Sequence, residues 1–246
     1  MEQKLIAQGA EAIITLNENT ITKDRIKKSY RIPELDNRIR KRRTKKEAKL
    51  LLKASKIIHC PIPANKSEQL TRGGGRGRGG TQIHMPYIKG QKLSENLNNF
   101  PLTKQKQILK QIGQNVSELH AEDIIHGDLT TSNMILVTPS SKKISHLTTS
   151  SRRIQAKQDS KPHNCASAPI IYFIDFGLGY ISRKIEDKAV DIHLLRQALE
   201  AKHFEHWEDL FKEFIKGYKS RGRVGREPSK VLERLKAVEK RGRYKH

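Results

Sequence analysis

The octapeptide HGDLTTSN at residues 126–133 and the tripeptide DFG at residues 175–177 decide how this sequence folds. The first motif lies between two short apolar segments, and the second ends the strongly β-prone run IIYFI. This pattern predicts two polar loops that project from neighbouring buried segments. A single aspartate in a loop is most often a turn former or a helix cap. The combination of Asp128, Asn133 and Asp175 in this order favours a chemical role instead.

The order of the two motifs matches the protein kinases, which have a catalytic-loop Asp, an Asn five residues later and the metal-binding Asp of D-F-G. D-F-G alone occurs often by chance, whereas the full combination is specific. The phosphates of ATP carry dense negative charge that Mg²⁺ neutralises through oxygen ligands. We therefore predict ATP and Mg²⁺ as cofactors, with Asn133 and Asp175 as metal ligands. Asp128 is the predicted catalytic residue that orients or deprotonates the attacking hydroxyl or water.

A kinase site also needs a lysine on a strand and a glutamate on the next helix to orient it. Lys23 is predicted to end the strand NTITK, and Glu47 lies on the basic helix that follows, so we assign these two roles to them. Lys27 and Lys28 compete for the lysine role but fall in the loop after the strand. Glu34 is the rival glutamate, although it lies early in its helix.

Two further segments are expected to contact the nucleotide. A tight turn of a β-hairpin, with one glycine instead of the three of G-x-G-x-x-G, is predicted to cover it; its residues are Gln8, Gly9, Ala10, Glu11 and Ala12. The segment 85–90 occupies the place of the hinge between lobes, where the backbone would meet adenine. The residues assigned there are Met85, Tyr87 and Ile88, and a plain strand and turn is the alternative.

The sequence departs from ordinary kinases in two ways. It has His-Gly-Asp where H-R-D is usual, so the arginine that reads a phosphorylated activation loop is missing. No A-P-E follows Gly177, and only 69 residues (246 − 177) remain after it. Both departures predict a shortened kinase without a deep peptide-docking platform.

The periodicity predicts an α+β fold of the bilobal protein-kinase type, with a small β-rich N-lobe over 1–90 and a shortened helical C-lobe over 91–246. Residues 103–121 form a clear amphipathic helix. Three more helices are expected at 187–202, 203–219 and 229–240. The middle one should bury a face made of Phe204, Trp207, Leu210, Phe211, Phe214 and Tyr218.

Two polar stretches interrupt this pattern. The Gly/Arg-rich insert at 66–81 reads as a flexible loop or as an RNA-contacting segment. The insert at 138–168 is rich in Ser, Thr and Lys, and we expect it to be disordered.

The charge is strongly positive, with 49 Lys and Arg against 26 Asp and Glu, a net charge of +23 and a pI of about 10.1. Residues 23–53 alone carry 14 basic and 4 acidic residues, a net of +10 (14 − 4), which favours an anion-binding surface. A charge excess of this size is typical of nucleic-acid contact. Two cysteines exclude a disulfide framework. The sequence shows neither a signal peptide nor an apolar run long enough for a membrane, so the cytosol or nucleus is expected.

These residues resemble the PRPK family, the small atypical kinase/ATPase subunit of the KEOPS (EKC) complex. The resemblance rests on the blocks at 8–12, 23–52, 126–136 and 175–203 and on the ending RGRYKH. It implies Mg²⁺-dependent ATP hydrolysis and serine/threonine phosphorylation activity. It also implies a role in making threonylcarbamoyl-adenosine in transfer RNA, with the threonylcarbamoyl-transferase subunit, other KEOPS subunits and transfer RNA as partners. The site roles given above carry over to this chain by the same resemblance.

Two alternatives stay open at the level of sequence. The chain could be a free-standing protein serine/threonine kinase, which would phosphorylate specific proteins. It could also be a nucleic-acid-binding pseudo-kinase, which would bind RNA without turning over ATP.

Overall fold

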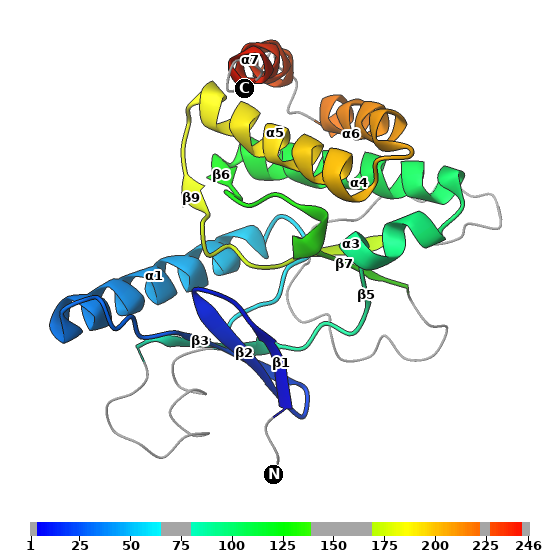
Figure 1. The fold of residues 1–246 in the computed structure, drawn as a ribbon. Coiled ribbons are helices and arrows are strands. Elements are labelled where there is room, and N and C mark those ends of the chain that lie inside the picture. The colour runs from blue at the N-terminus through cyan, green and yellow to red at the C-terminus, as the bar shows by residue number, and fades with distance from the viewer. Residues whose placement is uncertain (1–3, 65–79, 139–168, 222–226, 243–246) are drawn as a thin grey trace.

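Four antiparallel strands build the N-terminal sheet, in the order β1-β2-β3-β4 (Figure 1). They are β1 (Lys4–Gln8), β2 (Ala12–Asn17), β3 (Thr20–Arg25) and β4 (Gln82–Pro86). The predicted hairpin with a tight turn is therefore confirmed. β3 continues two residues past Lys23, so the prediction that Lys23 ends its strand was wrong. The strand is extended because Ala12 of β2 pairs with Arg25.

The computed structural model describes residues 4–64, 80–138, 169–221 and 227–242. The predictions for the Gly/Arg-rich insert and for the Ser/Thr/Lys-rich insert lie almost wholly outside this part of the chain. Cys165 and the last residues of the basic ending lie outside it as well. Cys60 is buried, and its thiol donates to the carbonyl of Leu51 at 3.5 Å. Burial raises the pKa of that thiol to about 12.

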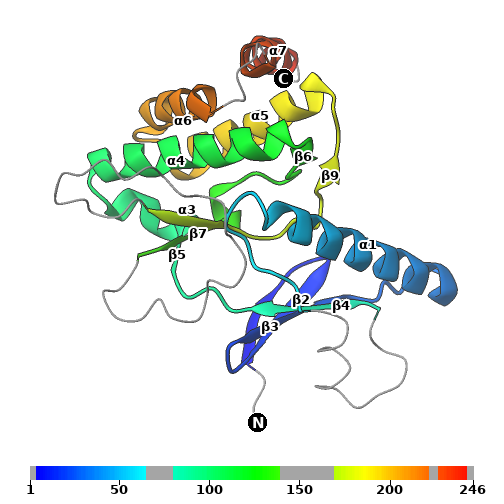
Figure 2. The ribbon, with the colours of Figure 1, turned by 180° about the vertical axis from the view of Figure 1, so that it is seen from behind.

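One long helix, α1 (Pro33–Ala54), lies between the sheet and the helical part, and its first turns project past the sheet (Figures 1 and 2). Proline suits the first turn of a helix because its missing N–H is not needed there. Only one side of α1 is buried. That side carries Leu50, Leu51 and Ala54 at the C-terminal end, where they join the main core.

The helical part contains most of the hydrophobic core. A linker at 87–90 leads from the sheet into the helical part. The elements of the helical part are, in chain order, β5 (Gln91–Lys92), α3 (Leu93–Asn96), η1 (Leu97–Asn99), α4 (Leu102–Ala121), β6 (Ile124–Ile125), η2 (Thr131–Asn133), β7 (Met134–Val137), β8 (Ile170–Phe173), β9 (Tyr180–Ile181), α5 (Ile185–Lys202), α6 (Trp207–Arg221) and α7 (Glu227–Gly242). β5, β7 and β8 form one small sheet, and β6 pairs with β9. Among the described helices, none has the length and apolar character to cross a membrane.

Helices α4 and α6 approach each other at two glycines. A methyl group on Gly113 of α4 would meet the backbone of Phe214 and Tyr218, and one on Gly217 of α6 would meet the carbonyl of Lys110. Glycine weakens a helix interior by about 1 kcal/mol relative to alanine. Here it lets the two backbones come into direct contact.

The start of α6 differs from the prediction. The helix begins at Trp207 because residues 204–206 form a turn, in which the N–H of His206 donates to the carbonyl of His203 at 3.3 Å. Phe204 lies in this turn and is 76% exposed, so the prediction that it packs in the core was wrong. Leu210, Phe214 and Tyr218 are buried as predicted.

Helix α7 is attached to α5 by a small apolar contact and several ion pairs. Val231 and Leu235 are its buried apolar residues. The ion pairs join Lys188 to Glu227 at 2.5 Å, Glu186 to Arg234 and Arg241, and Arg196 to Glu239. Lys188 is 1% exposed and also donates to Asp123 at 2.9 Å. Charge therefore contributes much of the attachment of α7.

Candidate active site

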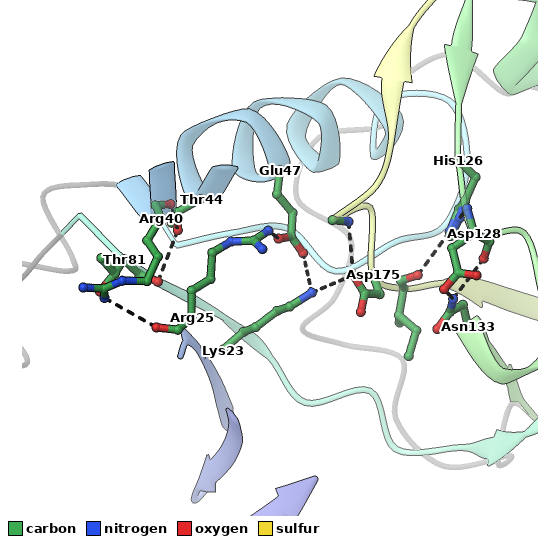
Figure 3. A network of polar contacts seen from close by, with 12 residues as sticks. Lys23, Arg25, Arg40, Thr44, Glu47, Thr81, His126, Asp128, Asn133 and Asp175 are labelled. Carbon is green, nitrogen blue, oxygen red and sulfur yellow. Dashed lines mark hydrogen bonds and ion pairs between the residues drawn. The ribbon is translucent and has the colours of Figure 1, made fainter. Parts of the chain in front are cut away.

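Lys23 lies at the centre of a buried group of charges between the sheet and the helical part (Figure 3). Its Nζ is 2.8 Å from Oε1 of Glu47 on α1 and 2.6 Å from Oδ1 of Asp175. Lys23 is 6% exposed and Glu47 is 1% exposed. Burial of an ionised side chain is costly unless it is paired and hydrogen-bonded. The structure thus brings together three residues that lie far apart in the sequence.

The rival residues for these two roles lie elsewhere. Lys27 and Glu34 are solvent-exposed. Lys28 donates from its Nζ to the backbone carbonyl of Ala10 in the β1–β2 turn. Because none of the three reaches the buried charges, Lys23 and Glu47 keep the assignment made from the sequence.

Arg25 is a member of this group that sequence reasoning missed. Its Nη2 is 2.5 Å from Oε2 of Glu47, so Glu47 is held by a different cation on each oxygen. Side chains two residues apart on a strand point to the same face, and the spacing of Lys23 and Arg25 was the available signal. The Nε of Arg25 is buried and has no hydrogen-bond partner among the described residues. Two cations and two carboxylates, those of Glu47 and Asp175, give the group a net charge of zero.

Asp175 occupies an unusual backbone position just after β8. Its φ is +61°, in the left-handed region that non-glycine residues seldom adopt. Its Oδ1 accepts the backbone N–H of Gly177 at 3.1 Å, which stabilises the turn. Burial would raise the pKa of Asp175, but the Lys23 ammonium outweighs that effect and lowers the pKa below its usual value. Asp175 is therefore ionised at neutral pH and available as an oxygen ligand.

Asp128 and Asn133 form a second pair on the neighbouring loop (Figure 3). The amide Nδ2 of Asn133 donates to Oδ2 of Asp128 at 2.8 Å and to its backbone carbonyl at 2.9 Å. The 3₁₀ turn η2 holds Asn133 in place, with its N–H donating to the carbonyl of Thr130 at 3.0 Å. Because the amide nitrogen is committed to Asp128, the amide oxygen is left for another partner.

The loop that carries Asp128 is anchored by Asp191 on α5, which sequence reasoning also missed. Asp191 is 2% exposed, and its two oxygens accept the backbone N–H groups of His126 at 2.8 Å and Gly127 at 2.9 Å. His120 lies 3.3 Å from the same carboxylate and 2.9 Å from the hydroxyl of Tyr218. Burial would raise the pKa of Asp191, but these hydrogen bonds lower it. No local pattern in the sequence marks this residue.

Gly127 explains why arginine is absent from the His-Gly-Asp motif. Its φ is +78°, which glycine adopts without strain. A methyl group at this position would lie 2.6 Å from the carbonyl oxygen of Leu178. Any larger residue would push the two motif loops apart. Phe176 fills the space beside them, with its ring centroid 4.5 Å from that of His126.

The predicted nucleotide-covering turn lies between β1 and β2 and is held by contacts of its own. The N–H of Gly9 donates to the carbonyl of Ala12 at 3.0 Å, and Glu11 pairs with Arg43 of α1 at 2.7 Å. Gln8 and Ala10 are exposed beside them. The contact of these residues with a nucleotide stays a prediction.

The predicted hinge residues lie at the end of β4 and in the linker after it. Met85 and Ile88 are half-buried, whereas Tyr87 is 40% exposed. The backbone N–H of Tyr87 donates to the carbonyl of Asn19, so it is not free to meet adenine. Met85 pairs with Ile21 in the sheet, and the contact of Met85 and Ile88 with adenine stays a prediction.

The oxygens in the site suit a hard divalent cation bound together with phosphate. Carboxylate and amide oxygens are ligands that Mg²⁺ accepts, and Mg²⁺ usually binds through one or two carboxylates plus substrate phosphates. Asp175 and Asn133 supply such oxygens. Among the described residues, no cluster of three or more His, Cys, Asp or Glu side chains could hold a metal without further ligands. The residues present therefore fit a metal that arrives with a nucleotide.

Comparison with known proteins identifies close relatives over nearly the full length. The chain is 36% identical to "KEOPS complex subunit Bud32" of Pyrococcus abyssi over 255 residues, which cover 98% of this chain and 96% of the relative. It is 35% identical to "EKC/KEOPS complex subunit BUD32" of Encephalitozoon cuniculi, covering 96% of this chain and 93% of the relative. No family model matches the chain.

Two other matches are a longer, bifunctional relative and a solved structure with a similar fold. The whole chain is 32% identical to 38% of a "Probable bifunctional tRNA threonylcarbamoyladenosine biosynthesis protein" of Methanobrevibacter smithii. Among solved structures, "WaaP in complex with acyl carrier protein" superposes with a TM-score of 0.54 at 11% identity, covering 98% of this chain and 88% of that one. That likeness concerns the fold alone and supports the predicted α+β, kinase-like architecture.

Proposed function

The chain belongs to the Bud32 family of KEOPS complex subunits, and on that premise we propose that it is an atypical serine/threonine kinase that also hydrolyses ATP, in support of threonylcarbamoyladenosine modification of transfer RNA. A relative from Archaeoglobus fulgidus, 34% identical over 96% of this chain, is named a probable serine/threonine-protein kinase. The relative from Methanobrevibacter smithii carries transfer-RNA modification in its name. Both activities therefore have support among proteins that match this chain throughout.

The contact of Lys23 with both Glu47 and Asp175 is the observation that carries the enzymatic part of the proposal. In this proposal Lys23 binds the α- and β-phosphates of ATP, and Glu47 keeps it in position. Asp128 is the catalytic residue that orients the attacking hydroxyl or water, and its link to Asn133 fixes its direction. Fixed charges aimed at the reacting phosphoryl group are the main source of catalysis in this reaction class.

Asn133 and Asp175 would hold the metal, which we propose to be Mg²⁺. When bound, the metal neutralises charge on the phosphates during phosphoryl transfer. The protein side chains do the rest: Lys23 binds phosphate, Asp128 receives or orients the proton, and Asp191 holds the loop that carries Asp128. The backbone around Met85 and Ile88 is proposed to meet the adenine ring.

We propose that the chain works with a threonylcarbamoyl-transferase subunit, with other KEOPS subunits and with transfer RNA. The archaeal bifunctional protein supports this, because this chain matches 38% of it and leaves a larger remainder for a second function. The loop between Gly177 and α5 also supports it. That loop consists of residues 178–184 only, which is short for the docking of a peptide substrate. The cytosol or nucleus is the proposed compartment, as the place where transfer RNA is modified.

The fate of the γ-phosphate tests the proposal. The full chain is incubated with Mg²⁺ and γ-labelled ATP, with and without transfer RNA, alone and with the threonylcarbamoyl-transferase subunit from the same organism. Asp175→Ala removes the proposed metal ligand, and Asp209→Ala removes a carboxylate on α6 that pairs with Lys106, far along the chain from the site, as a matched control.

We expect labelled free phosphate from the wild type and from Asp209→Ala, and a loss of at least about 100-fold in Asp175→Ala, as for the removal of one group that stabilises transition-state charge. Label transferred mainly to side chains of other proteins would favour the free-standing kinase. RNA binding without any turnover, with the partner present, would favour the pseudo-kinase and refute the proposal.

A further inference from the structure

Helix α1 exposes a set of cations that have no acidic partner. Among the described residues, five side chains of α1 are solvent-exposed and form no ion pair: Arg38, Lys41, Arg42, Lys45 and Lys49. Two of the acidic residues of the helix, Asp36 and Glu47, are buried. Glu34 is exposed in the first turn, four residues before Arg38 and on the same face, and it forms no ion pair with the five among the described residues. From Lys41 to Lys49 the charges therefore add without an acidic neighbour on the same face.

The positions of the five cations follow the period of the helix. The other four follow Arg38 by 3, 4, 7 and 11 residues. At 3.6 residues per turn, all five therefore lie within a sector of about 100° around the helix axis. The buried residues, such as Glu47 and Ala54, fall on the opposite side. We call these five side chains the α1 stripe. At 1.5 Å per residue, the stripe is about 16 Å long.

The other cations of the helix are engaged within the protein. Arg40 pairs with Asp36 at 2.7 Å, and Arg43 pairs with Glu11 at 2.7 Å. Lys46 lies 5.8 Å from the ring centroid of Tyr180, and Lys53 donates to the carbonyl of Glu122 at 3.2 Å. The helix thus separates cations that contact another part of the protein from cations that have no partner among the described residues. That separation distinguishes the stripe from a uniformly charged, merely solvated helix.

We propose that the α1 stripe is a binding site for the phosphate backbone of RNA. The inference rests on the proposed function, which supplies an RNA substrate, and it assigns part of the contact to five residues outside the candidate active site. A helix that lies in a membrane surface needs exposed apolar residues along its length. Between Arg38 and Lys49 the stripe has none, which argues against a lipid surface. Lysine and arginine side chains that contact phosphates along a groove or helix hold a nucleic acid in place without reading its base sequence.

The location of α1 suits this role. Its first half projects past the sheet in both views (Figures 1 and 2), and Arg38, Lys41 and Arg42 in this half are solvent-exposed. The buried half of the same helix carries Glu47, which contacts Lys23. RNA on the stripe would therefore bind the outer face of the helix whose inner face positions the phosphate-binding lysine.

The size of the expected effect follows from counterion release. Each phosphate contact contributes a slope of about −0.7 (single strand) to −0.9 (duplex) to the dependence of log K on log salt concentration. Five contacts correspond to a slope difference of about 3.5 to 4.5. Between about 50 and 200 mM salt, the wild type should thus lose about 100- to 500-fold more affinity than a protein without the stripe.

The experiment compares two full-length variants with equal net charge. The first replaces the stripe with glutamine (Arg38→Gln, Lys41→Gln, Arg42→Gln, Lys45→Gln, Lys49→Gln). The control replaces five exposed lysines of α4, α6 and α7 (Lys110→Gln, Lys219→Gln, Lys230→Gln, Lys236→Gln, Lys240→Gln). Affinity for an unmodified transfer-RNA transcript is measured at several salt concentrations. ATP turnover and thermal unfolding are measured on the same samples.

In the stripe variant, we expect the slope of log K against log salt concentration to be smaller than in the wild type by about 3.5 to 4.5. The control should keep most of the wild-type slope. Both variants should unfold and turn over ATP as the wild type does. Wild-type affinity and slope in the stripe variant, or an equal loss in the control, would overturn the proposal. So would a higher affinity of the wild type for polyglutamate than for RNA of equal charge, which would indicate an acidic protein as the ligand. Absence of ATP turnover in the wild type would count against the proposed function alone.

Discussion

Replacement of Arg25 by methionine removes the second cation on Glu47 and keeps most of the volume of the side chain. In the wild type, Lys23 and Arg25 each bind one oxygen of Glu47, at 2.8 and 2.5 Å, and all three side chains are at most 7% exposed. Together with the partly exposed carboxylate of Asp175, these side chains carry no net charge. Arg25→Met leaves this group with a net charge of −1.

The expected loss in the free energy of unfolding follows from the ion pairs that Arg25→Met breaks. Removal of one partner from a buried ion pair costs about 3–5 kcal/mol, because the other partner stays buried and uncompensated. Here Lys23 still binds the other oxygen of Glu47, so we expect the lower part of that range or slightly less, about 2–3 kcal/mol. The stability of a typical domain is only about 5–15 kcal/mol, so the loss is easily measured.

Urea unfolding followed by circular dichroism measures the effect. With a slope of about 2–3 kcal/mol per M, the midpoint should fall by about 1 M. Arg43→Met is the matched control, because Arg43 and Glu11 form a pair that is about half exposed, and such surface pairs are worth at most about 1 kcal/mol. The double variant Arg25→Met/Glu47→Gln should recover part of the loss, since it removes the unpaired charge.

A second measurement separates positioning from stability. At temperatures where the variant is fully folded, Arg25→Met should lower ATP turnover, because Glu47 is held at one oxygen only and Lys23 is less well placed. If Arg25→Met destabilised the protein no more than Arg43→Met and left turnover unchanged, our interpretation of Arg25 as a positioning residue would be wrong.

Three other predictions concern the helical part. Asp191→Asn leaves one of the two backbone N–H groups of the catalytic loop without an acceptor, and should cost about 1–3 kcal/mol in urea unfolding together with most of the ATP turnover. His203 is buried, and burial, with a smaller effect of Lys202, lowers its pKa to about 4; since the unfolded chain binds that proton near pH 6.5, the free energy of unfolding should fall by about 3 kcal/mol as the pH is lowered from 6.5 to 4. The variant His203→Gln should lack this part of the pH dependence, and an unchanged profile would contradict it. Gly113→Ala should destabilise by about 1–3 kcal/mol despite the better helix propensity of alanine, because its methyl group meets the backbone of α6; a gain in melting temperature would refute the close contact.

The kinase-like fold and the grouping of the motif residues were predictable because kinases use fixed residue types in a fixed order. Given that order, Lys23, Glu47 and Asp175 had to meet, although 152 residues separate the first from the last. Helix α4 was also predictable, since its apolar residues repeat with the helical period. The catalytic roles assigned to these residues remain predictions.

What the sequence did not reveal depends on tertiary contacts. Asp191 matters because α5 packs beside the loop that carries Asp128, and no pattern near Asp191 indicates that. The glycine in His-Gly-Asp read as the loss of an arginine, whereas the structure shows a close approach to Leu178 that permits no side chain. Phe204 was expected in the core because it continues the apolar period of α6, but a turn at 204–206 precedes that helix.

The attachment of α7 to α5 has a consequence for the order in which the protein opens. Native-state hydrogen exchange resolves cooperative units that open with different free energies. α4 and α6, whose backbones meet at Gly113 and Gly217, should exchange slowly and together. α7 depends on ion pairs around two buried apolar residues, and those of Glu186 with Arg234 and Arg241 are partly exposed, so it should exchange first. Because salt screens exposed charges, that first opening should become faster at high ionic strength, while exchange in α4 stays the same.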